Sequence, residues 1–245
     1  MKAIEVKELT KIFGSFKAVD RITFDVDQGE IFGFLGANGA GKTTAMRMLC
    51  GLLNPTSGEG KVAGFNIYKD TEKIKRNIGY MSQKFSLYED LTTTENLELF
   101  GGIYGMSRKE MKEKSRKVVA ELGLQKEKDM LVNSLPLGVK QKVSFAVSTF
   151  HTPKIVFLDE PTGGVDPIAR RTFWEMIYQV ADRGITAFVT THYMDEAEYC
   201  NRVSIMVDGR IKALGSPSEL KSKYNAGSMG DVFQSLARQA KRVEL

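Results

Sequence analysis

Hydrophobic residues follow two patterns along the chain, and each predicts a different kind of β-strand. Residues 4–6 and 22–26 alternate between apolar and polar side chains, as strands with one buried face do. Residues 31–35, 155–158 and 185–189 are largely apolar runs, which are typical of parallel strands covered on both faces. We therefore predict an N-terminal β layer that leads into a parallel-sheet core.

Residues 87–150 have a helical pattern instead. The segments Thr92–Glu95 and Ser107–Glu110 have the capping-box spacing, in which a hydroxyl and a carboxylate satisfy free amides of the first helical turn. The second box opens a helix with a partial apolar stripe, formed by Met111, Val118, Val119 and Leu122. We expect residues 1–245 to form a single domain, with a helical subdomain at about residues 87–150 inserted in the α/β core.

Turn and cap signals predict several further elements. Residues 53–60 contain Pro, Ser, Asn and two glycines, and are expected to form a turn that ends the helix begun at Gly41. Asp166 and Pro167 predict a helix between two core strands that runs to about Val180. This alternation of strand and helix indicates a doubly wound sheet.

Shorter elements are predicted elsewhere. Residues 61–63 continue the β layer, and residues 78–81 are expected to form a short buried strand. Asp208 and Gly209 predict a hairpin turn, and Ser216–Glu219 opens a capped helix. The tail is expected to be a packing helix with apolar residues at helical spacing, namely Phe233, Leu236 and Ala240.

Composition adds limits to this picture. With 245 residues, of which 42% are hydrophobic and 27% charged, the chain is an ordinary globular protein with room for a buried core. Its apolar runs are too short to span a bilayer, and its N-terminus lacks the apolar core of a signal peptide. If the protein works at a membrane, another chain is expected to supply the spans.

Charge and cysteine content argue against two kinds of site. The net charge is +5, and the segment 108–128 interleaves lysines with glutamates, as solvated helix faces do, so nucleic-acid binding is not expected. Cys50 and Cys200 have no second thiol or histidine at metal-ligand spacing, so we expect both to be buried in a protein of a reducing compartment. A metal site of protein ligands is not indicated.

The segment after the apolar run at residues 31–35 fits the phosphate-loop pattern G-x-x-x-x-G-K-[ST] and precedes a helix. It comprises Gly36, Ala37, Asn38, Gly39, Ala40, Gly41, Lys42, Thr43 and Thr44. The glycines let backbone N–H groups converge on phosphate oxygens at a helix N-terminus, whose partial positive charge favours anions. Lys42 is expected to reach the β- and γ-phosphates, and the Thr43 hydroxyl to help hold Mg²⁺. The alternative, a glycine-rich turn with a chance lysine, is disfavoured by the strand and helix on either side.

An acidic pair follows the apolar run at residues 155–158 and supplies the other half of a Mg-nucleotide site. Asp159 is expected to bind Mg²⁺, and Glu160 to orient and polarise an attacking water as general base. His192 follows a third core strand, at the edge where a doubly wound sheet binds ligands, and is expected to contact the γ-phosphate or the water. His151 is assigned no role.

In combination and order, these motifs resemble those of the ATP-binding subunit of an ABC transporter, and the likeness covers essentially all 245 residues. The matching segments are the phosphate loop, Gln83, residues 158–162, residues 165–167 and the pair Thr191-His192. The resemblance implies an α/β P-loop NTPase with a RecA-like core, an N-terminal antiparallel β layer and a helical insertion. It also implies that the chain binds ATP and Mg²⁺ and hydrolyses ATP to power transport, with exporter-like residues at 192–198.

Further roles and partners come only from this resemblance. Phe13 would stack on adenine, Gln83 would contact Mg²⁺ or the water and sense the membrane partner, and Asp166 would communicate across a dimer. The helical insertion would dock on a transmembrane permease subunit, and a second ATP-binding cassette, identical or not, would complete the ATP sites. The protein would be cytoplasmic, peripheral on the cytoplasmic face of the cell membrane.

One loop departs from the family pattern. The family's signature is usually L-S-G-G-Q, whereas this chain has Leu135-Pro136-Leu137-Gly138-Val139. In the family this loop caps the γ-phosphate held by the other subunit, and Pro136 offers neither a hydroxyl nor an N–H group. The N–H groups of Leu137 and Gly138 and the helix dipole remain available. Because proline is well tolerated at a first helical position, we expect the loop to keep its shape.

Two other classes of function compete with transport. A soluble, non-transport ABC protein acting on ribosomes or nucleic acid would usually carry two cassettes or long coiled-coil insertions, and neither is present in this sequence. A small-molecule P-loop kinase is disfavoured by the pair Asp159-Glu160 and by His192.

Overall fold

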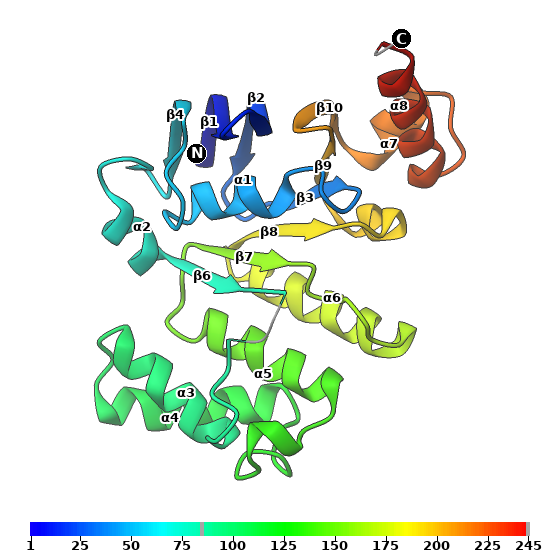
Figure 1. Cartoon of the computed structure of the whole chain (residues 1–245). Coiled ribbons are helices and arrows are strands. Elements are labelled where there is room, and N and C mark those ends of the chain that lie inside the picture. The colour runs from blue at the N-terminus through cyan, green and yellow to red at the C-terminus, as the bar shows by residue number, and fades with distance from the viewer. Residues whose placement is uncertain (84–85, 244–245) are drawn as a thin grey trace.

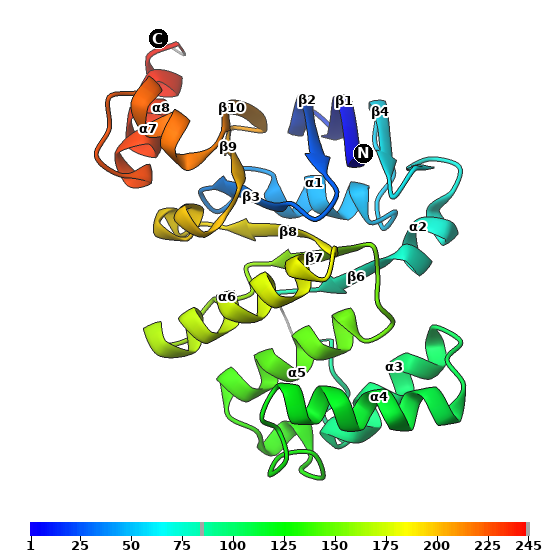
Figure 2. The same cartoon turned by 180° about the vertical axis from the view of Figure 1, so that it is seen from behind.

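The computed structural model describes residues 1–83 and 86–243, with side chains as far as residue 238, and arranges them as two β-sheets with helices around them (Figure 1, Figure 2). An antiparallel sheet has the strand order β2-β1-β4-β5. Its strands are β1 (Lys2–Phe13), β2 (Phe16–Asp27), β4 (Ser57–Val62) and β5 (Phe65–Asn66). A second sheet has the order β10-β9-β3-β8-β7-β6 and is parallel except for β10. Its strands are β3 (Ile31–Gly36), β6 (Ile78–Met81), β7 (Ile155–Asp159), β8 (Thr186–Thr191), β9 (Arg202–Val207) and β10 (Arg210–Gly215).

Helices occupy both faces of the parallel sheet and form most of the lower part of the molecule in Figure 1. They are α1 (Lys42–Leu49), α2 (Thr71–Asn77), α3 (Thr93–Ile103), α4 (Arg108–Glu121), α5 (Leu137–Thr149), α6 (Pro167–Asp182), α7 (Pro217–Lys223) and α8 (Met229–Val243). Two short 3-10 helices are η1 (Val132–Ser134) and η2 (Met194–Tyr199). No helix in the described part of the chain is long and apolar enough to cross a bilayer.

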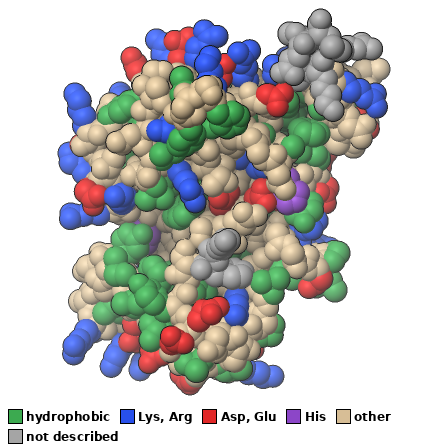
Figure 3. Space-filling model, in the orientation of Figure 1, with side chains coloured by type: hydrophobic (Ala, Val, Ile, Leu, Met, Phe, Trp, Pro, Cys, Tyr) green, Lys and Arg blue, Asp and Glu red, His purple; other side chains and the backbone are tan. Residues whose placement is uncertain are grey.

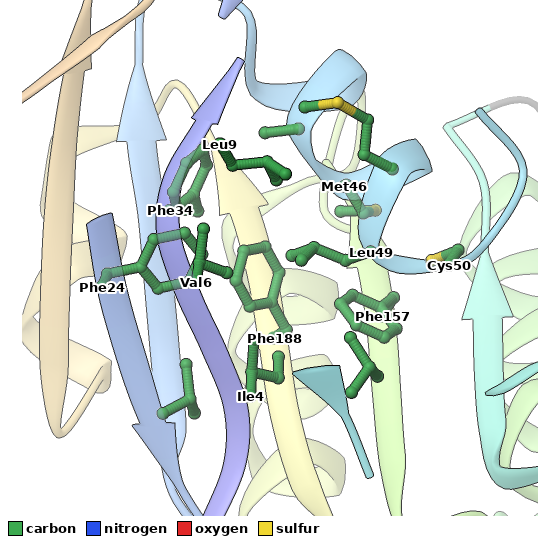
Figure 4. Packing of buried hydrophobic residues seen from close by; sticks show 14 of the residues in the cluster. Ile4, Val6, Leu9, Phe24, Phe34, Met46, Leu49, Cys50, Phe157 and Phe188 are labelled. Carbon is green, nitrogen blue, oxygen red and sulfur yellow. The ribbon is translucent and has the colours of Figure 1, made fainter. Parts of the chain in front are cut away.

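Aromatic side chains join the two sheets (Figure 4). The ring of Phe24 from β2 lies 5.5 Å from that of Phe34 on β3, and Phe188 of β8 lies 5.3 Å from both Phe34 and Phe157, measured between centroids. Met46 of α1 belongs to the same buried cluster. Burying such a side chain contributes about 1.5–3 kcal/mol, so this cluster fixes α1 and the antiparallel sheet on one face of the parallel sheet.

The other face of the parallel sheet is covered mainly by α6. Trp174 and Ile177 of this helix are buried against β7 and β8 residues such as Val156 and Val189. Leu236 of α8 belongs to the same cluster, whereas the side chain of Ala240 lies outside the described residues. The predicted doubly wound α/β class is thus confirmed, because continuous apolar strands are buried on both faces.

The helices between residues 87 and 150 enclose a third buried cluster, which includes Leu97, Val143 and Phe150. Complete capping boxes at Thr92 and Ser107 begin α3 and α4, as predicted, and a third box at Ser216 begins α7. The helical part approaches the sheet closely at Gly79 of β6, where a Cβ would overlap the carbonyl oxygen of Ser148 in α5.

Two features differ from the sequence-based expectation. Residues 57–60 were expected to lie in a turn, but they form β4, because β1 pairs with them at Lys7–Glu59 and Val6–Gly60. Gly58 has φ +94°, and its Cα lies so close to β1 that a Cβ would overlap the carbonyl of Glu8. Long-range pairing therefore outweighs local turn chemistry there. Helix α2 was not anticipated, since Ile74 is its one buried side chain and leaves almost no apolar pattern.

Candidate functional site

The phosphate loop joins β3 to α1 and packs closely against Ala18 of β2. Gly41 is the N-cap of α1 with φ +103°, and a Cβ at this position would overlap the carbonyl oxygen of Ala18. Only glycine satisfies both conditions. Lys42 is 4% exposed and turns into the loop, where its Nζ donates to the carbonyl oxygens of Gly36 at 2.8 Å and Ala37 at 3.1 Å.

The apex of the loop faces solvent. Ala37, Asn38 and Gly39 are exposed, whereas Ala40 is buried and the side chains of Thr43 and Thr44 are half-buried. Gly39 has φ +82° and open space where a Cβ would stand. An exposed, glycine-containing backbone at the start of a helix, with the Lys42 ammonium turned into it, fits the phosphate groups of a nucleotide.

Asp159, the last residue of β7, meets the start of α1. Its Oδ1 accepts hydrogen bonds from the Thr43 hydroxyl at 3.2 Å and from the Thr190 hydroxyl at 2.6 Å. Hydroxyl and carboxylate oxygens are the ligands that Mg²⁺ prefers. Within the described residues no group of three His, Cys, Asp or Glu side chains could hold a metal, so Mg²⁺ at Thr43 and Asp159 would complete its shell with phosphate oxygens and water.

Glu160 turns away from its neighbour Asp159 because its backbone is left-handed, with φ +48°. Its N–H donates to both the carbonyl and the hydroxyl oxygen of Thr190, each at 3.1 Å, which holds this conformation. The carboxylate lies 3.0 Å from His192 Nδ1, 3.1 Å from Gln83 Nε2 and 3.3 Å from Lys42 Nζ. Three segments distant in sequence thus converge on one carboxylate.

A cavity of about 300 Å³ opens beside this carboxylate and is large enough for several water molecules. Gln83, Gln141, Glu160 and His192 are among its lining residues. Gln141 of α5 donates to the carbonyl of Gly163 at 3.3 Å and so ties the helical part to the loop after β7. Leu137 lies at the rim of the same cavity.

Two predicted binding residues, Phe13 and Asp166, lie outside this cluster. Phe13 at the end of β1 is 48% exposed, with the Lys11 ammonium 5.0 Å from its ring centroid. Asp166 is exposed and caps α6, accepting from the N–H groups of Ile168 and Ala169 at 2.9 and 3.0 Å, and the latter hydrogen bond lowers the pKa of its carboxyl.

The unusual loop ends with Pro136 as the N-cap of α5, not as the first helical residue that we expected. The reason is its ψ of 153°, which leaves the helix to begin at Leu137. The side chain of Pro136 makes no capping hydrogen bond. Leu137 is 43% exposed, and Gly138 follows it in the first turn, where a Cβ would stand 3.7 Å from Ala169 Cβ.

Sequence reasoning missed Thr190 and Gln141. The available signal for Thr190 was its place after the apolar run Ala187–Val189, two residues before His192. Gln141 lies in a helix whose pattern gives no such sign. The contacts of His151 are with residues outside the site. Its ring stacks on Tyr104 with centroids 3.5 Å apart, and burial lowers its pKa to about 4. Both cysteines are buried, as expected.

Comparison with known proteins defines the class. Residues 19–163, more than half of the chain, match the family described as ABC transporter. The chain therefore belongs to the ABC transporter family, as an ATP-binding cassette, the part of such a transporter that binds and hydrolyses ATP. The fold and family predicted from the sequence are confirmed.

The relatives are transporter ATP-binding proteins. The probable multidrug ABC transporter ATP-binding protein YbhF of Escherichia coli (strain K12) is 48% identical over 220 residues, covering 90% of this chain and 38% of YbhF. The daunorubicin/doxorubicin resistance ATP-binding protein DrrA of Streptomyces peucetius is 36% identical, covering 92% of this chain and 68% of DrrA. A solved structure of an ATP-binding subunit of an ABC transporter matches with a TM-score of 0.86 at 28% identity, covering 96% of this chain and 99% of the other. The chain spans less than half the length of YbhF.

Proposed function

We propose that this chain powers an exporter-type ABC transporter by ATP hydrolysis, with Glu160 as the general base. The observation that carries the proposal is the Glu160 carboxylate, held by Gln83 and His192 beside the phosphate loop. A general base must lie within hydrogen-bond reach of the proton it takes and must be fixed in orientation, and these contacts support both conditions. The multidrug and drug-resistance relatives support the exporter assignment.

In this reaction the oxygen of a water molecule attacks the γ-phosphorus of ATP while Glu160 accepts the water's proton. The bond from the γ-phosphorus to the β–γ bridging oxygen breaks, and ADP and inorganic phosphate are formed. His192 Nδ1 lies 3.0 Å from the Glu160 carboxylate, so the imidazole would orient the base. The other ring nitrogen, Nε2, would contact the γ-phosphate.

Other residues would bind the nucleotide and the metal. The loop amides from Gly36 to Gly41 and the Lys42 ammonium would bind the β- and γ-phosphates, and Phe13 would stack on adenine. Thr43, Asp159 and Gln83 would hold Mg²⁺, which neutralises charge on the phosphates when bound. The oxygen set at Thr43 and Asp159 supports this assignment.

A second cassette would complete the site. The exposed Leu137, the adjacent Gly138 and the exposed Asp166 lie at the starts of two neighbouring helices, α5 and α6. We propose that the N–H groups of Leu137 and Gly138 cap the γ-phosphate bound by the other cassette, and that Asp166 contacts that cassette across the dimer.

The transmembrane subunit would dock on the helical part. Hydrophobic side chains gather over the lower part of the molecule in Figure 3, where α3 faces the viewer in Figure 1. We name as the α3 patch four exposed residues, Tyr88, Leu99, Ile103 and Tyr104, of which Ile103 is 64% exposed. Contiguous exposed apolar surface of this kind is typical of a protein interface. Held there, the chain would lie on the cytoplasmic face of the membrane.

The test of the base is Glu160→Gln, which preserves shape and removes the proton acceptor. We expect ATP turnover to be lost by a factor of at least about 10² while ATP still binds. Turnover is measured by phosphate release and binding by titration with a fluorescent ATP analogue. Wild-type turnover in the variant would remove Glu160 from this role.

Co-purification distinguishes the transporter function from the alternative, a soluble ABC ATPase acting on ribosomes or nucleic acid. If the chain powers a transporter, a tagged chain should co-purify from solubilised membranes with a multi-span protein, and Ile103→Glu in the α3 patch should abolish this. Lys109→Glu, on the neighbouring helix α4, is the control. Sedimentation with ribosomes instead would overturn the transporter assignment.

A further inference from the structure

Arg170 in α6 reaches from its own helix onto the segment that follows His192. Its guanidinium carbon lies 4.3 Å from the centroid of the Tyr193 ring. Its Nη1 lies 3.5 Å from Asp195 Oδ2, and its Nε lies 3.5 Å from Glu196 Oε1. One side chain thus contacts three residues within the first four after His192.

The contact with Glu196 is the most important of the three for stability, because Glu196 is a buried carboxylate. It is fully buried, and its carboxylate accepts a hydrogen bond from the hydroxyl of Thr162, two residues after Glu160. Arg170 is the one cation within ion-pair distance of Glu196 in the part of the chain that the structure describes. Removing the counter-charge of a buried carboxylate is strongly unfavourable. Arg170 therefore ties α6 to the segment after β8, and Glu196 joins that segment to the loop after β7 through Thr162.

Tyr193 connects this arrangement to His192. The two rings lie with centroids 4.2 Å apart, and the Tyr193 N–H donates to the Thr191 hydroxyl at 3.0 Å. The Tyr193 ring thus contacts both the guanidinium of Arg170 and the imidazole of His192. The imidazole in turn lies 3.0 Å from Glu160.

The backbone N–H of Arg170 donates to the Asp166 carbonyl at 3.0 Å, which is the ordinary i to i−4 hydrogen bond of the first helical turn. The side chain of Arg170 contacts Glu196 by charge and Tyr193 by stacking. The 3.5 Å separation from Glu196 exceeds the usual length of a charge-assisted hydrogen bond, and Arg170 Nε has no hydrogen-bond partner among the described residues. A planar guanidinium can stack on a ring in this way, whereas an ammonium cannot.

We propose that Arg170 is a positioning residue for hydrolysis: its side chain packs Tyr193 against His192 so that His192 faces Glu160. The inference rests on the proposed ATPase function. Arg171, the next residue, is 81% exposed and pairs only with Glu175 among the described ion pairs, so it provides a matched control.

The first test needs no turnover. The chain has two histidines, so a ¹³C-histidine NMR spectrum of the full chain shows two imidazoles, assigned with His151→Asn. Arg170→Gln should shift the His192 signal and leave the His151 signal in place, and Arg171→Gln should move neither. An unmoved His192 signal in Arg170→Gln would overturn the proposal, even if the chain proved not to hydrolyse ATP.

The second test uses kinetics. We expect Arg170→Gln and Arg170→Lys to lower kcat for ATP by about 10- to 100-fold with KM changed less than about twofold, and Arg171→Gln to match the wild type. A change confined to KM, or a kcat equal to that of Arg171→Gln, would contradict the proposal. If Glu160→Gln retained wild-type turnover, the proposed base would fail independently of this comparison.

Tyr193 supplies a second variant, should Arg170→Gln fail to fold. Tyr193→Phe keeps the ring and should keep kcat, whereas Tyr193→Ala should lower kcat and shift the His192 signal. The double variant Arg170→Gln/Tyr193→Ala should have a kcat no lower than that of the slower single variant, since both substitutions remove the same contact. Additive losses, or a Tyr193→Ala variant with wild-type kcat and an unmoved His192 signal, would refute the connection.

Discussion

The ammonium group of Lys42 lies 3.3 Å from the carboxylate of Glu160, and the two side chains are only 4% and 10% exposed. The same ammonium donates to two carbonyl oxygens of its own loop. The lysine expected to bind phosphate is therefore already paired with the proposed base. Phosphate oxygens that reach the loop compete with Glu160 for this cation.

This competition predicts the direction of an affinity change. Glu160→Gln removes a negative charge beside the phosphate site and frees Lys42, so ATP should bind about three- to tenfold more tightly, allowing for partial screening. Titration of a fluorescent ATP analogue measures the change. Glu175→Gln, an exposed carboxylate on α6, should leave affinity unaltered. Weaker binding by Glu160→Gln would mean that the pair with Lys42 does not oppose the nucleotide.

Pro136 at the N-cap of α5 predicts two separable effects of Pro136→Ser. A serine there can accept from the free amides of the first turn, so the free energy of unfolding should rise by about 0.5–1 kcal/mol. In the proposed dimer the added hydroxyl would lie toward the γ-phosphate of the other cassette, so it should also raise ATPase activity. Pro136→Ala lacks the hydroxyl and is the control.

Urea denaturation and phosphate release report these effects independently. A stabilised Pro136→Ser variant with unchanged turnover would show that the backbone amides and helix dipole of α5 suffice for the composite site.

Two adjacent glycines of α3 should respond in opposite directions to alanine. A Cβ at Gly101 would lie 2.8 Å from Phe150 Cε1 and 2.9 Å from Met111 Cγ, so Gly101→Ala should cost about 1–3 kcal/mol by overpacking. At Gly102 a Cβ would lie 4.0 Å from Met111 Sδ, an ordinary contact, so Gly102→Ala should stabilise the helix by about 0.5–1 kcal/mol. The urea midpoints of the two variants check both signs. Equal shifts would contradict the close contact of α3 with Phe150.

His151 predicts a loss of stability in mild acid. Burial lowers its pKa to about 4 in the folded chain, from an unfolded value of 6.5. The unfolded chain therefore binds a proton that the folded chain does not as the pH falls from 6.5 to 4, and stability is lost through that window. By pH 5 the loss from this one group should be about 1 kcal/mol, after discounting for its partial exposure.

The measurement is the free energy of unfolding at pH 7 and pH 5 for the wild type and His151→Gln. The amide of a glutamine can still donate to the Ile78 carbonyl, which lies 3.0 Å from His151 Nε2, but it does not titrate. The variant should lose less stability than the wild type between these pH values. Parallel losses would assign the acid sensitivity to other groups.

The sequence predicted those features that depend on short, local patterns. The phosphate loop, the acidic end of β7 and the capping boxes each need a few residues in fixed order, and the structure has strands and helices where these patterns predict them. Convergence of Asp159 and His192 at one sheet edge follows from the parallel order of β7 and β8.

The remaining features depend on contacts between distant segments. Strand β4 includes Gly58 because β1 pairs beside it, and no local signal in residues 57–60 reports that pairing. Arg170 is one of several charged residues on an amphipathic helix, and its contact with Tyr193 exists only after α6 packs beside η2. Pro136 was assigned one position too far into α5, since a residue with proline's φ can be either the N-cap or the first helical residue.

Asp159 and Glu160 adjoin in the chain, yet Asp159 faces Thr43 and Glu160 faces His192. Their separation is fixed by one peptide unit and one left-handed residue, so rotation of a subdomain or closure of a dimer moves both carboxylates together. The backbone positions of the proposed metal ligand and base are thus fixed relative to each other, and only rotation of their side chains changes the spacing of the two carboxylates. Gln83 and His192, which hold the Glu160 carboxylate, belong to other segments and can approach or leave it.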